Sequence, residues 1–361
     1  MAHYRIQFTP VSDYFFGGEK HRLMNGVPVA DYFTVSRPYP QQTGILGMIR
    51  YLMLLLHPEA FDGKRITDKT QAKDLIGEKS FSYPGNTQNF GKIKSISPLY
   101  FIQDKNGKTI PWYFGPMDYP FKLARNDDEF QLCYRNKTYN AKDHGNLVQP
   151  YLYNAKSQTI PLSNLISYHS RIGIEKRHRG DDPAEKFYKI KTARLAPGWH
   201  FAVNAEINDE NLEKITSPVF LPMGAERKMF KIEIKKLNKE PAKQPPPPRY
   251  KRPVPYILCI SDCFMDGGKI KIKDDIPFAV TDYVSFRNLK TQVDKTGTYT
   301  AFKGKETPDG IERSERYNLL LRGSVMYFLS NDQLEKMEEH LKDFGKENTI
   351  GFNQFISIKT N

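Results

Sequence analysis

The chain has 361 residues and a formal net charge of +13, and 39% of its residues are hydrophobic. A chain of this length fits about two domains, and its hydrophobic content excludes a wholly disordered protein. The basic balance favours a polyanionic partner, either nucleic acid or an acidic membrane surface. Residues 227–252 hold ten Lys or Arg against two Glu, although a solvated face or a charged linker would explain this run equally well.

Several classes of protein do not fit the sequence. The three cysteines, Cys133, Cys259 and Cys263, form no CxxC motif and no zinc-type spacing, so we expect buried thiols in a reducing cytosol. The N-terminus lacks the order of a signal peptide, and the longest apolar run, residues 51–56, is too short to span a bilayer. We therefore expect a cytoplasmic protein with no membrane partner, no metal and no cofactor.

The first half of the chain begins with a strand and a helix. Residues 3–9 alternate apolar and polar side chains, which predicts a half-buried strand. Apolar residues at helical spacing between Thr43, a possible cap, and Pro58 predict a helix. Residues 60–165 contain short runs rich in Tyr and Phe that are broken by turns, and these predict strands and surface insertions.

The second half twice shows the order strand, helix, strand. Alternation predicts strands at 199–207 and 227–237, with a short helix capped by Asn208 between them. Residues 318–329 then predict a strand pair or a bulged strand. A Ser330/Gln333 capping box predicts a helix ending at Gly345, followed by a closing strand from residue 349 onward. This order is typical of a ferredoxin-like unit.

A proline-rich segment separates these two units. Residues 238–254 include four consecutive prolines flanked by Lys and Arg, which excludes a helix and favours extended polyproline II. We expect a mobile basic loop and favour a solvated spacer inside one domain over a proline-motif docking site. The lysines of this loop could still gather loosely on RNA.

Motifs for common enzyme chemistries are absent from the sequence. It contains no P-loop, no GxGxxG after a strand, no HExxH and no GxSxG. A metal-independent ribonuclease needs only a base, an acid and a cation, which Tyr168, His169, Lys176 and His178 could supply. We favour a non-catalytic role for each histidine, because the sequence supplies no fixed partner for it.

Glycines recur beside basic residues. Gly17 and Gly18, and the turns at 223–227, 321–325 and 350–352, fall at predicted strand edges, where a missing Cβ lets another backbone approach. Their repetition in a basic chain suggests a surface on which an RNA backbone lies flat, with bases exposed to Tyr and Phe.

These motifs together resemble a known family, the RAMP superfamily of CRISPR-associated proteins. Within it, they are similar to the third Cmr-module RAMP subunit of type III-B effector complexes. The segments that carry the resemblance are FTPVSDYFFGGEKHRL, SRPYPQQTGILGMIRYLML, RIGIEKRHRGDDPAEKFYKIKTARLAPGWHFAV, MGAERKMF, LLRGSVMYFL and GFNQFISI.

The resemblance implies an α+β fold of two ferredoxin-like (RRM-like) RAMP domains with inserted loops. The first would span residues 1–165, and the second residues 166–361, including a basic finger at about 170–194 and the proline-rich loop. It also implies a non-catalytic subunit that holds the 5′ repeat-derived tag of the CRISPR RNA (crRNA). Such a subunit bridges the large polymerase-like subunit to the backbone RAMP subunit and meets target RNA indirectly.

Two alternatives remain open at this point. One is a metal-independent crRNA-processing endoribonuclease of the same superfamily, which would need a positioned base. The other is the equivalent RAMP subunit of a type III-A complex, which would differ in its partners more than in its chemistry.

The resemblance further implies which residues contact RNA. For Arg50, and for Glu226 beside Arg227, a buried ion pair or a helix-end contact is an equally good explanation. The residues are Lys20, His21, Arg22, Arg37, Gln41, Gln42, Thr43, Arg50, Arg171, Lys176, Arg177, His178, Arg179 and Arg227.

Overall fold

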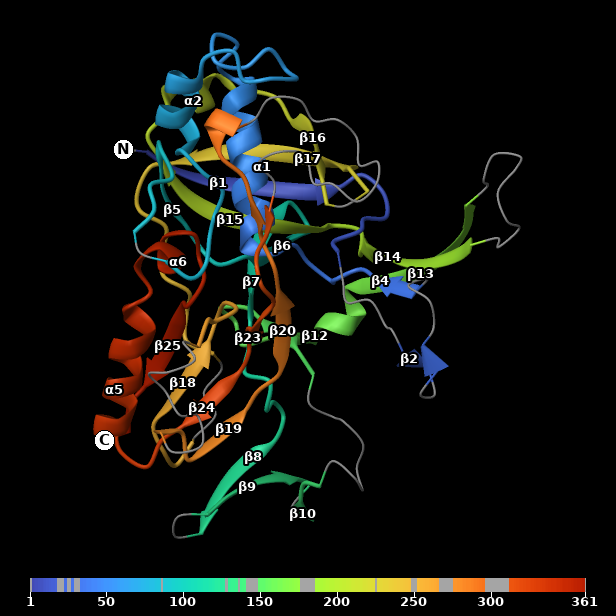
Figure 1. Cartoon of the computed structure of the whole chain (residues 1–361). Helices are drawn as coiled ribbons and strands as arrows, with labels where there is room; N and C mark the ends of the chain where they lie inside the picture. The colour runs from blue at the N-terminus through green and yellow to red at the C-terminus, as the bar shows by residue number, and fades with distance from the viewer. Residues whose placement is uncertain are drawn as a thin grey trace.

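The computed structural model gives a mixed α+β protein that is built mostly of strands (Figure 1). The predicted mixed α+β class is confirmed, whereas the two ferredoxin-like domains stay a prediction. The structure describes residues 2–17, 23–24, 27–28, 33–85, 87–126, 129–135, 137–140, 149–175, 186–224, 226–247, 252–265, 275–295 and 312–360.

The largest sheet has nine strands and places the N-terminal strand between two late ones. Strand β1 pairs antiparallel with β15 on one side and with β17 on the other. The order across the sheet is β12 (Thr159–Pro161), β11 (Tyr151–Tyr153), β7 (Lys108–Phe114), β6 (Tyr100–Lys105), β15 (Trp199–Ile207), β1 (Ala2–Pro10), β17 (Lys228–Leu237) and β16 (Val219–Met223), with β5 (Ile93–Ile96) also paired to β15. One sheet thus joins segments from both sides of the boundary predicted between residues 165 and 166.

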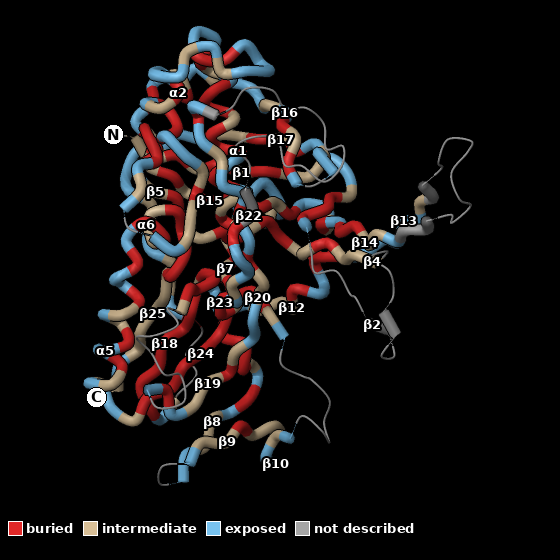
Figure 2. The backbone as a smooth tube through the Cα atoms, viewed as in Figure 1, coloured by how far each residue is buried: buried red, intermediate tan, exposed pale blue. Residues whose placement is uncertain are grey.

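Helix α1 (Gln42–Leu55) packs its apolar side on one face of this sheet. The alternation of β1 turns Tyr4, Ile6 and Phe8 toward the helix, where all three are fully buried. The predictions of a strand at 3–9 and a helix beginning near residue 43 are confirmed. Burial along the described residues follows this layering (Figure 2).

Two short helices differ from the sequence predictions. Helix α2 (Lys69–Ile76) lies in a stretch for which we expected strands and insertions, and Asp68 caps it by accepting from the backbone N–H groups of Thr70 and Gln71. The short 3-10 helix η2 (Glu210–Lys214) is capped by Asp209 rather than by Asn208.

A second, four-stranded sheet forms the C-terminal unit. Its order is β19 (Phe278–Val280), β24 (Val325–Tyr327), β18 (Tyr256–Cys259) and β25 (Phe355–Ile358). Helix α5 (Asn331–Lys342) packs on one face, and the small sheet β8 (Lys122–Asn126), β9 (Glu129–Tyr134) and β10 (Lys137–Thr138) contributes to the core on the other. Cys259 and Cys263 are buried as expected, whereas Cys133 on β9 is only half-buried.

The predicted end of the chain is partly right. Ser330 caps α5 by accepting from the backbone N–H of Gln333, as the capping box requires. Gly345 does not end this helix but begins a further short helix, α6 (Gly345–Thr349). The closing strand starts only at Phe355, because a turn at residues 350–351 and a short loop at 352–354 follow α6.

A three-stranded arm projects from the body between the two sheets (Figure 1). Strands β13 (Ile166–Glu175) and β14 (Lys186–Leu195) form an antiparallel hairpin, and β4 (Phe33–Val35) adds to β14 in parallel. The remaining short elements are the pairs β2 (Leu23–Met24) with β3 (Val27–Pro28), β20 (Tyr283–Phe286) with β23 (Tyr317–Leu320) and β21 (Leu289–Lys290) with β22 (Glu312–Arg313), and the 3-10 helices η1 (Leu162–Asn164) and η3 (Val293–Lys295).

A buried ion pair fixes the C-terminal unit against the main sheet. Asp262 accepts from the Nε and Nη2 atoms of Arg322, each at 3.0 Å, and the guanidinium is fully buried. The same guanidinium lies 4.6 Å from the ring centroid of Tyr39 and 5.0 Å from that of Phe114 on β7. One side chain therefore holds groups from both halves of the chain together.

The proline-rich segment is anchored where the structure describes it. Residues 238–247 form no helix or strand, but the Tyr153 hydroxyl donates to the carbonyl of Pro245 at 2.5 Å and accepts from Gln244 at 3.0 Å. The Arg252 guanidinium forms a buried ion pair with the Asp118 carboxylate. These contacts hold Gln244 and Pro245 against β11, and the mobility of the loop stays a prediction.

No helix in the described part of the chain is long and apolar enough to cross a bilayer.

Candidate nucleic-acid interface

A pocket of about 420 Å³ opens at the start of α1. It lies among the loop after β1, the entrance of α1, and the turn that joins β16 to β17. A volume of this size lies within the usual range for small-molecule pockets. The lining residues are Phe16, Gly17, Arg37, Pro40, Gln41, Thr43, Gly44, Gly47, Met48, Tyr51, Pro222, Met223, Gly224 and Arg227.

The pocket brings together four of the residues for which the family resemblance implies RNA contacts. Arg37, Gln41 and Thr43 are close in sequence, whereas Arg227 is almost two hundred positions away. The pairing of β1 with β17, next to β16, carries the turn with Arg227 to the entrance of α1. The fold thus assembles these four predicted positions at one place.

The start of α1 suits a negatively charged group. Gln41 is the N-cap residue but its side chain makes no capping hydrogen bond, and the first turn contains no acidic residue. The backbone N–H groups at a helix start carry partial positive charge and favour anions. Gly44 and Gly47 are exposed on the pocket side, so no side chain of theirs covers this end of the helix.

Arg37 ties the pocket to the C-terminal unit. Its backbone N–H donates to the carbonyl of Phe16 at 2.9 Å, and its guanidinium donates to the carbonyl of Ser285 on β20. The Gln41 amide donates to the same carbonyl at 3.4 Å. Both side chains are therefore held in place at the pocket wall by a segment of the second half.

Arg227 lines the pocket from the turn between β16 and β17 and is exposed. It adopts a left-handed conformation with φ of 49°, and its backbone N–H donates to the Gly224 carbonyl at 3.2 Å, which closes the turn. Glu226 is also exposed in this turn. The glycine turn therefore presents one cationic side chain to the pocket.

Two of the predicted RNA contacts are interior residues. Gln42 is fully buried, and its amide donates to the carbonyls of Ser97 at 3.0 Å and Ile350 at 2.7 Å, so it has no surface to offer an RNA. Arg50 is 9% exposed, and its guanidinium lies 5.5 Å from the ring centroid of Phe90. Burial lowers the pKa of Arg50 to about 10. For these two residues the structure supports a packing role.

The arm carries the remaining predicted contact that can be described. Arg171 is exposed on β13 and pairs with Asp13 at 3.1 Å. The Asp13 carboxylate also accepts from Thr192 on β14 at 3.3 Å, so it fixes the base of the arm. Strands β13 and β14 pair as a hairpin over residues 166–175 and 186–195. The basic finger at about 170–194 stays a prediction, since residues 176–185 lie outside the described residues. Seven predicted contacts, Lys20, His21, Arg22, Lys176, Arg177, His178 and Arg179, lie outside the described residues.

The arm also presents residues that belong to the predicted basic finger but not to the fourteen predicted RNA contacts. Lys189 and Lys191 lie 5.7 Å and 5.6 Å from the ring centroid of Phe33 on β4. Tyr168 and Ile172 are exposed on β13, opposite Ala193 and Lys189 in the strand register. Alternation in β14 could have placed the two lysines on one face, but their aromatic neighbour comes from a distant strand.

The described histidines with fixed carboxylate partners are not the ones that we considered for catalysis. His169 lies 3.5 Å from the Ser167 hydroxyl, and His178 is outside the described residues. His200 instead lies between Thr9, with its Nδ1 at 2.7 Å, and Asp104, with its Nε2 at 3.1 Å. Among the described residues, no group of three or more His, Cys, Asp or Glu could hold a metal ion.

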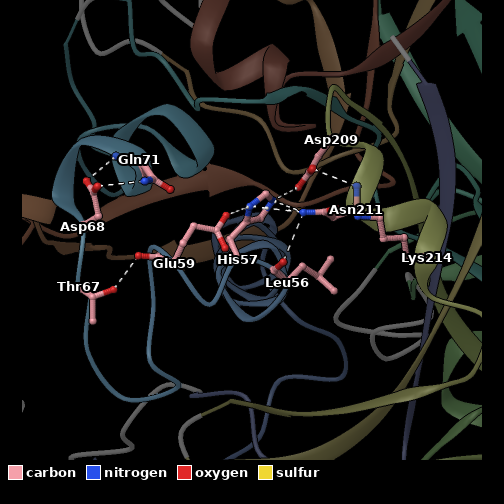
Figure 3. A network of polar contacts seen from close by, with 9 residues as sticks. All are labelled: Leu56, His57, Glu59, Thr67, Asp68, Gln71, Asp209, Asn211 and Lys214. Atoms are coloured by element: carbon pink, nitrogen blue, oxygen red, sulfur yellow. Dashed lines mark hydrogen bonds and ion pairs between the residues drawn. The ribbon is translucent and has the colours of Figure 1, made fainter.

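His57 joins the end of α1 to η2 through a polar network (Figure 3). Its Nδ1 lies 2.7 Å from Glu59 and its Nε2 lies 2.9 Å from Asp209, while Asn211 donates to the carbonyl of Leu56 at 3.4 Å. Hydrogen bonds from its own backbone N–H and from His57 lower the pKa of the Glu59 carboxyl. This network holds the far end of α1, away from the pocket.

A comparison with protein families identifies the chain. The family model described as "CRISPR-associated protein (Cas_Cmr3)" matches residues 145–360, which is more than half of the chain. The chain belongs to this family. The membership confirms the resemblance to CRISPR-associated RAMP proteins that the motifs indicate. Arg227 lies inside the matched region, whereas Arg37 precedes it.

One solved structure shows the same fold over nearly the whole chain. One chain of "Cryo-EM structure of the Type III-B Cmr-beta bound to cognate target RNA" is 16% identical, with a TM-score of 0.50 and coverage of 98% of this chain and 96% of that one. A chain of the same complex with AMPPnP is 15% identical, with a TM-score of 0.49 and the same coverage. No curated protein matches the sequence.

Proposed function

We propose that this Cas_Cmr3 family protein is a non-catalytic RNA-binding subunit of a cytoplasmic type III-B CRISPR effector complex. It holds the 5′ repeat-derived tag of the crRNA and bridges the large polymerase-like subunit to the backbone RAMP subunit. Its two halves are ferredoxin-like units, and it meets target RNA through the complex. The observation that carries the proposal is the pocket, because Arg37, Gln41, Thr43 and Arg227 meet in it.

The chemistry of the pocket supports a nucleotide of the tag as its ligand. Cationic side chains on two walls and the start of α1 suit a phosphate. Phe16, Met48 and Tyr51 supply apolar surface against which an unstacked base can pack. Gln41 and Thr43 offer polar groups to a base edge or a ribose hydroxyl.

The arm is the second RNA contact in this proposal. Lys189, Lys191 and Arg171 give it a positive surface, and the predicted contacts at 176–179 follow β13 directly in sequence. Phosphate contacts of this kind contribute affinity without sequence preference. Recognition of the tag therefore depends on the pocket, and the arm adds salt-dependent affinity.

The experiment is a salt titration of RNA binding by the full chain. The wild type is titrated with a crRNA and with the same RNA lacking its 5′ tag, and a denaturing gel reports cleavage. Arg227→Ala should weaken binding and lower the salt slope by about 0.7, the value for one phosphate contact on a single strand. Arg65→Ala, in an exposed loop near the far end of α1, is the matched control and should leave the slope unchanged.

The outcomes separate the alternatives. Tag-dependent binding of an intact RNA, with a lower slope in Arg227→Ala alone, supports the proposal. An equal salt slope for Arg227→Ala and wild type would show that the pocket does not contact the RNA. Cleavage that disappears in His169→Ala or His200→Ala would favour the endoribonuclease. Co-purification with type III-A subunits would reassign the complex.

A further inference from the structure

A row of polar side chains crosses the face of the main sheet that α1 does not cover. Arg5 on β1 lies directly opposite Asn204 on β15 and Lys235 on β17. Along its strand each of the three alternates with residues that pack in the core with α1, so all three point to the other face of the sheet. Arg5 and Asn204 are half-buried on this face, and Lys235 is exposed.

Two tyrosines lie next to this row. Tyr100 on β6 and Tyr113 on β7 have ring centroids 5.6 Å apart, and they pack together on the same face of the sheet. The Tyr100 hydroxyl donates to Oδ1 of Asn204 at 3.1 Å, and the Arg5 guanidinium interacts with the same hydroxyl. We call Arg5, Tyr100, Tyr113, Asn204 and Lys235 the Arg5 cluster.

Two cations of the cluster face each other. Like charges directly opposite each other on neighbouring strands are destabilising. In the described part of the chain neither Arg5 nor Lys235 forms an ion pair, and the Arg5 Nε is buried with no hydrogen-bond partner. The carboxylates two positions along β15 and β17 are Glu206 and Glu233, and Glu233 is already paired with Lys231 at 2.9 Å. The positive charge of Arg5 and Lys235 is thus left for a ligand to neutralise.

The groups of the cluster that stay available are hydrogen-bond donors. Since Oδ1 of Asn204 accepts from Tyr100, the N–H groups of the Asn204 amide are left to donate. Burial raises the pKa of Tyr113, although the positive charge of Arg5 opposes the rise, so the Tyr113 hydroxyl keeps its proton at neutral pH. Two such donors beside two cations match a phosphate group, whose oxygens carry negative charge and accept hydrogen bonds.

The proline-rich segment adds positive charge beside the cluster. It leaves β17 and reaches β11, where Gln244 donates to the Tyr153 hydroxyl, and the Tyr153 ring lies 6.1 Å from that of Tyr113. Five strand spacings of about 4.8 Å separate β17 from β11, and the seven residues up to Gln244 cover about 24 Å only when nearly extended. The segment therefore crosses this end of the sheet almost straight, with Lys239 and Lys243 exposed along it.

We propose that the Arg5 cluster is a second anion site that binds a phosphate group, carried either by an RNA strand or by a free nucleotide. Tyr113 is half-exposed beside the two cations and offers its ring to the base of the same nucleotide. The site goes beyond the proposed function, because it lies on the sheet face opposite α1 and none of its residues lines the pocket.

The test begins with the thermal stability of the full chain in inorganic phosphate and in adenosine monophosphate. Sodium chloride at the same ionic strength is the blank. A ligand that binds the folded chain raises its melting temperature, so both phosphates should raise that of wild type above the blank. Arg5→Gln and Lys235→Gln should each weaken binding on the order of tenfold, the loss of one charge-assisted hydrogen bond, and so remove most of the shift.

Matched controls separate the cluster from cations in general. Lys105 and Lys108 are also opposite each other, at the exposed tip of the hairpin of β6 and β7. Lys105→Gln and Lys108→Gln should keep the full phosphate shift, and so should Arg227→Ala in the pocket. Lys235 is exposed, so Lys235→Gln tests the site even where Arg5→Gln does not fold.

A salt titration of crRNA binding identifies the source of the phosphate. If the RNA strand supplies it, Lys235→Gln should lower the salt slope by about 0.7, the value for one contact on a single strand. A lost shift in adenosine monophosphate with an unchanged slope assigns the site to a free nucleotide.

Three results would overturn the site. One is a phosphate shift that both glutamine variants of the cluster retain. Another is a wild type without any shift, together with an unchanged slope in Lys235→Gln. The third is a shift that Arg227→Ala removes, because it would assign the phosphate to the pocket. In the first two cases the proposed function is unaffected, since Arg227→Ala tests it separately.

Discussion

Replacement of Gly224 by alanine tests how the pocket is built. Gly224 has φ of 83°, in the left-handed region, and a Cβ atom there would lie 2.4 Å from the carbonyl oxygen of Phe15. That oxygen belongs to the backbone of the loop after β1, so it cannot move aside as a flexible side chain would. Gly224→Ala must therefore shift either the turn or the loop, and both line the pocket.

The magnitude follows from two separate costs. A residue with a Cβ pays about 1–2 kcal/mol in the left-handed conformation, and forcing an atom into a packed site costs about 1–3 kcal/mol more. Gly224→Ala should then lower the free energy of unfolding by about 2–5 kcal/mol. The pocket should also widen or tilt, so RNA affinity should fall even where the protein is still folded.

Two other glycines of the same pocket are the controls. A Cβ on Gly17 or Gly47 would meet no atom within 4 Å. Gly17→Ala should be nearly neutral, and Gly47→Ala should stabilise the chain by up to about 1 kcal/mol, since Gly47 lies inside α1. Urea denaturation followed by circular dichroism measures all three variants. An unfolding free energy of Gly224→Ala within about 0.5 kcal/mol of wild type would refute the reasoning.

Three further predictions concern polar groups with fixed partners. Asp262→Ala should destabilise the chain by about 3–5 kcal/mol, because it leaves the buried Arg322 guanidinium uncompensated; a smaller loss in denaturant titration would contradict this. Gln42→Ala should cost about 1–3 kcal/mol by leaving carbonyls unpaired, yet crRNA affinity at a temperature where it is folded should equal that of wild type. Because the folded chain lowers the pKa of Glu59 from 4.5, the stability that its ionised form contributes is present above pH 4.5 and is lost as the pH falls through the lower folded pKa. Glu59→Gln should reduce the loss of stability at acid pH, and His57→Phe should do the same if the hydrogen bond from His57 lowers the pKa of Glu59. Stability–pH curves that match wild type for both variants would contradict this explanation.

The elements that could be predicted from sequence are those set by local periodicity. Strands β1, β15 and β17 alternate apolar and polar residues, and α1 repeats apolar residues at helical spacing, so burial of one face dictates each element. Their arrangement could not be predicted in this way. The pairing of β1 with two strands some two hundred residues later depends on contacts that no local window contains.

The same division holds for the site. The motif from Arg37 to Thr43 marks the helix entrance, but nothing in it separates half-buried Thr43, which lines the pocket, from fully buried Gln42, its direct neighbour. Gln42 is interior because its amide donates hydrogen bonds to the carbonyls of Ser97 and Ile350, which belong to distant segments of the chain. Phe33 joins Lys189 and Lys191 only because β4 pairs with β14, and a strand of three residues gives little sequence signal.

The glycines show why a motif can be recognised correctly and still be assigned to the wrong surface. We expected the glycine turns to let an RNA backbone approach, and at Gly224 and Gly351 a backbone does approach, but it is the protein's own. A Cβ on Gly351 would lie 2.7 Å from the carbonyl oxygen of Ser97, just as one on Gly224 would meet Phe15. Such glycines mark places where distant segments of the fold meet closely. Gly47, by contrast, is exposed on α1 with open space beside it. Close approach of an RNA backbone is therefore expected along this helix face, and the glycine turn contributes by fixing the wall that carries Arg227.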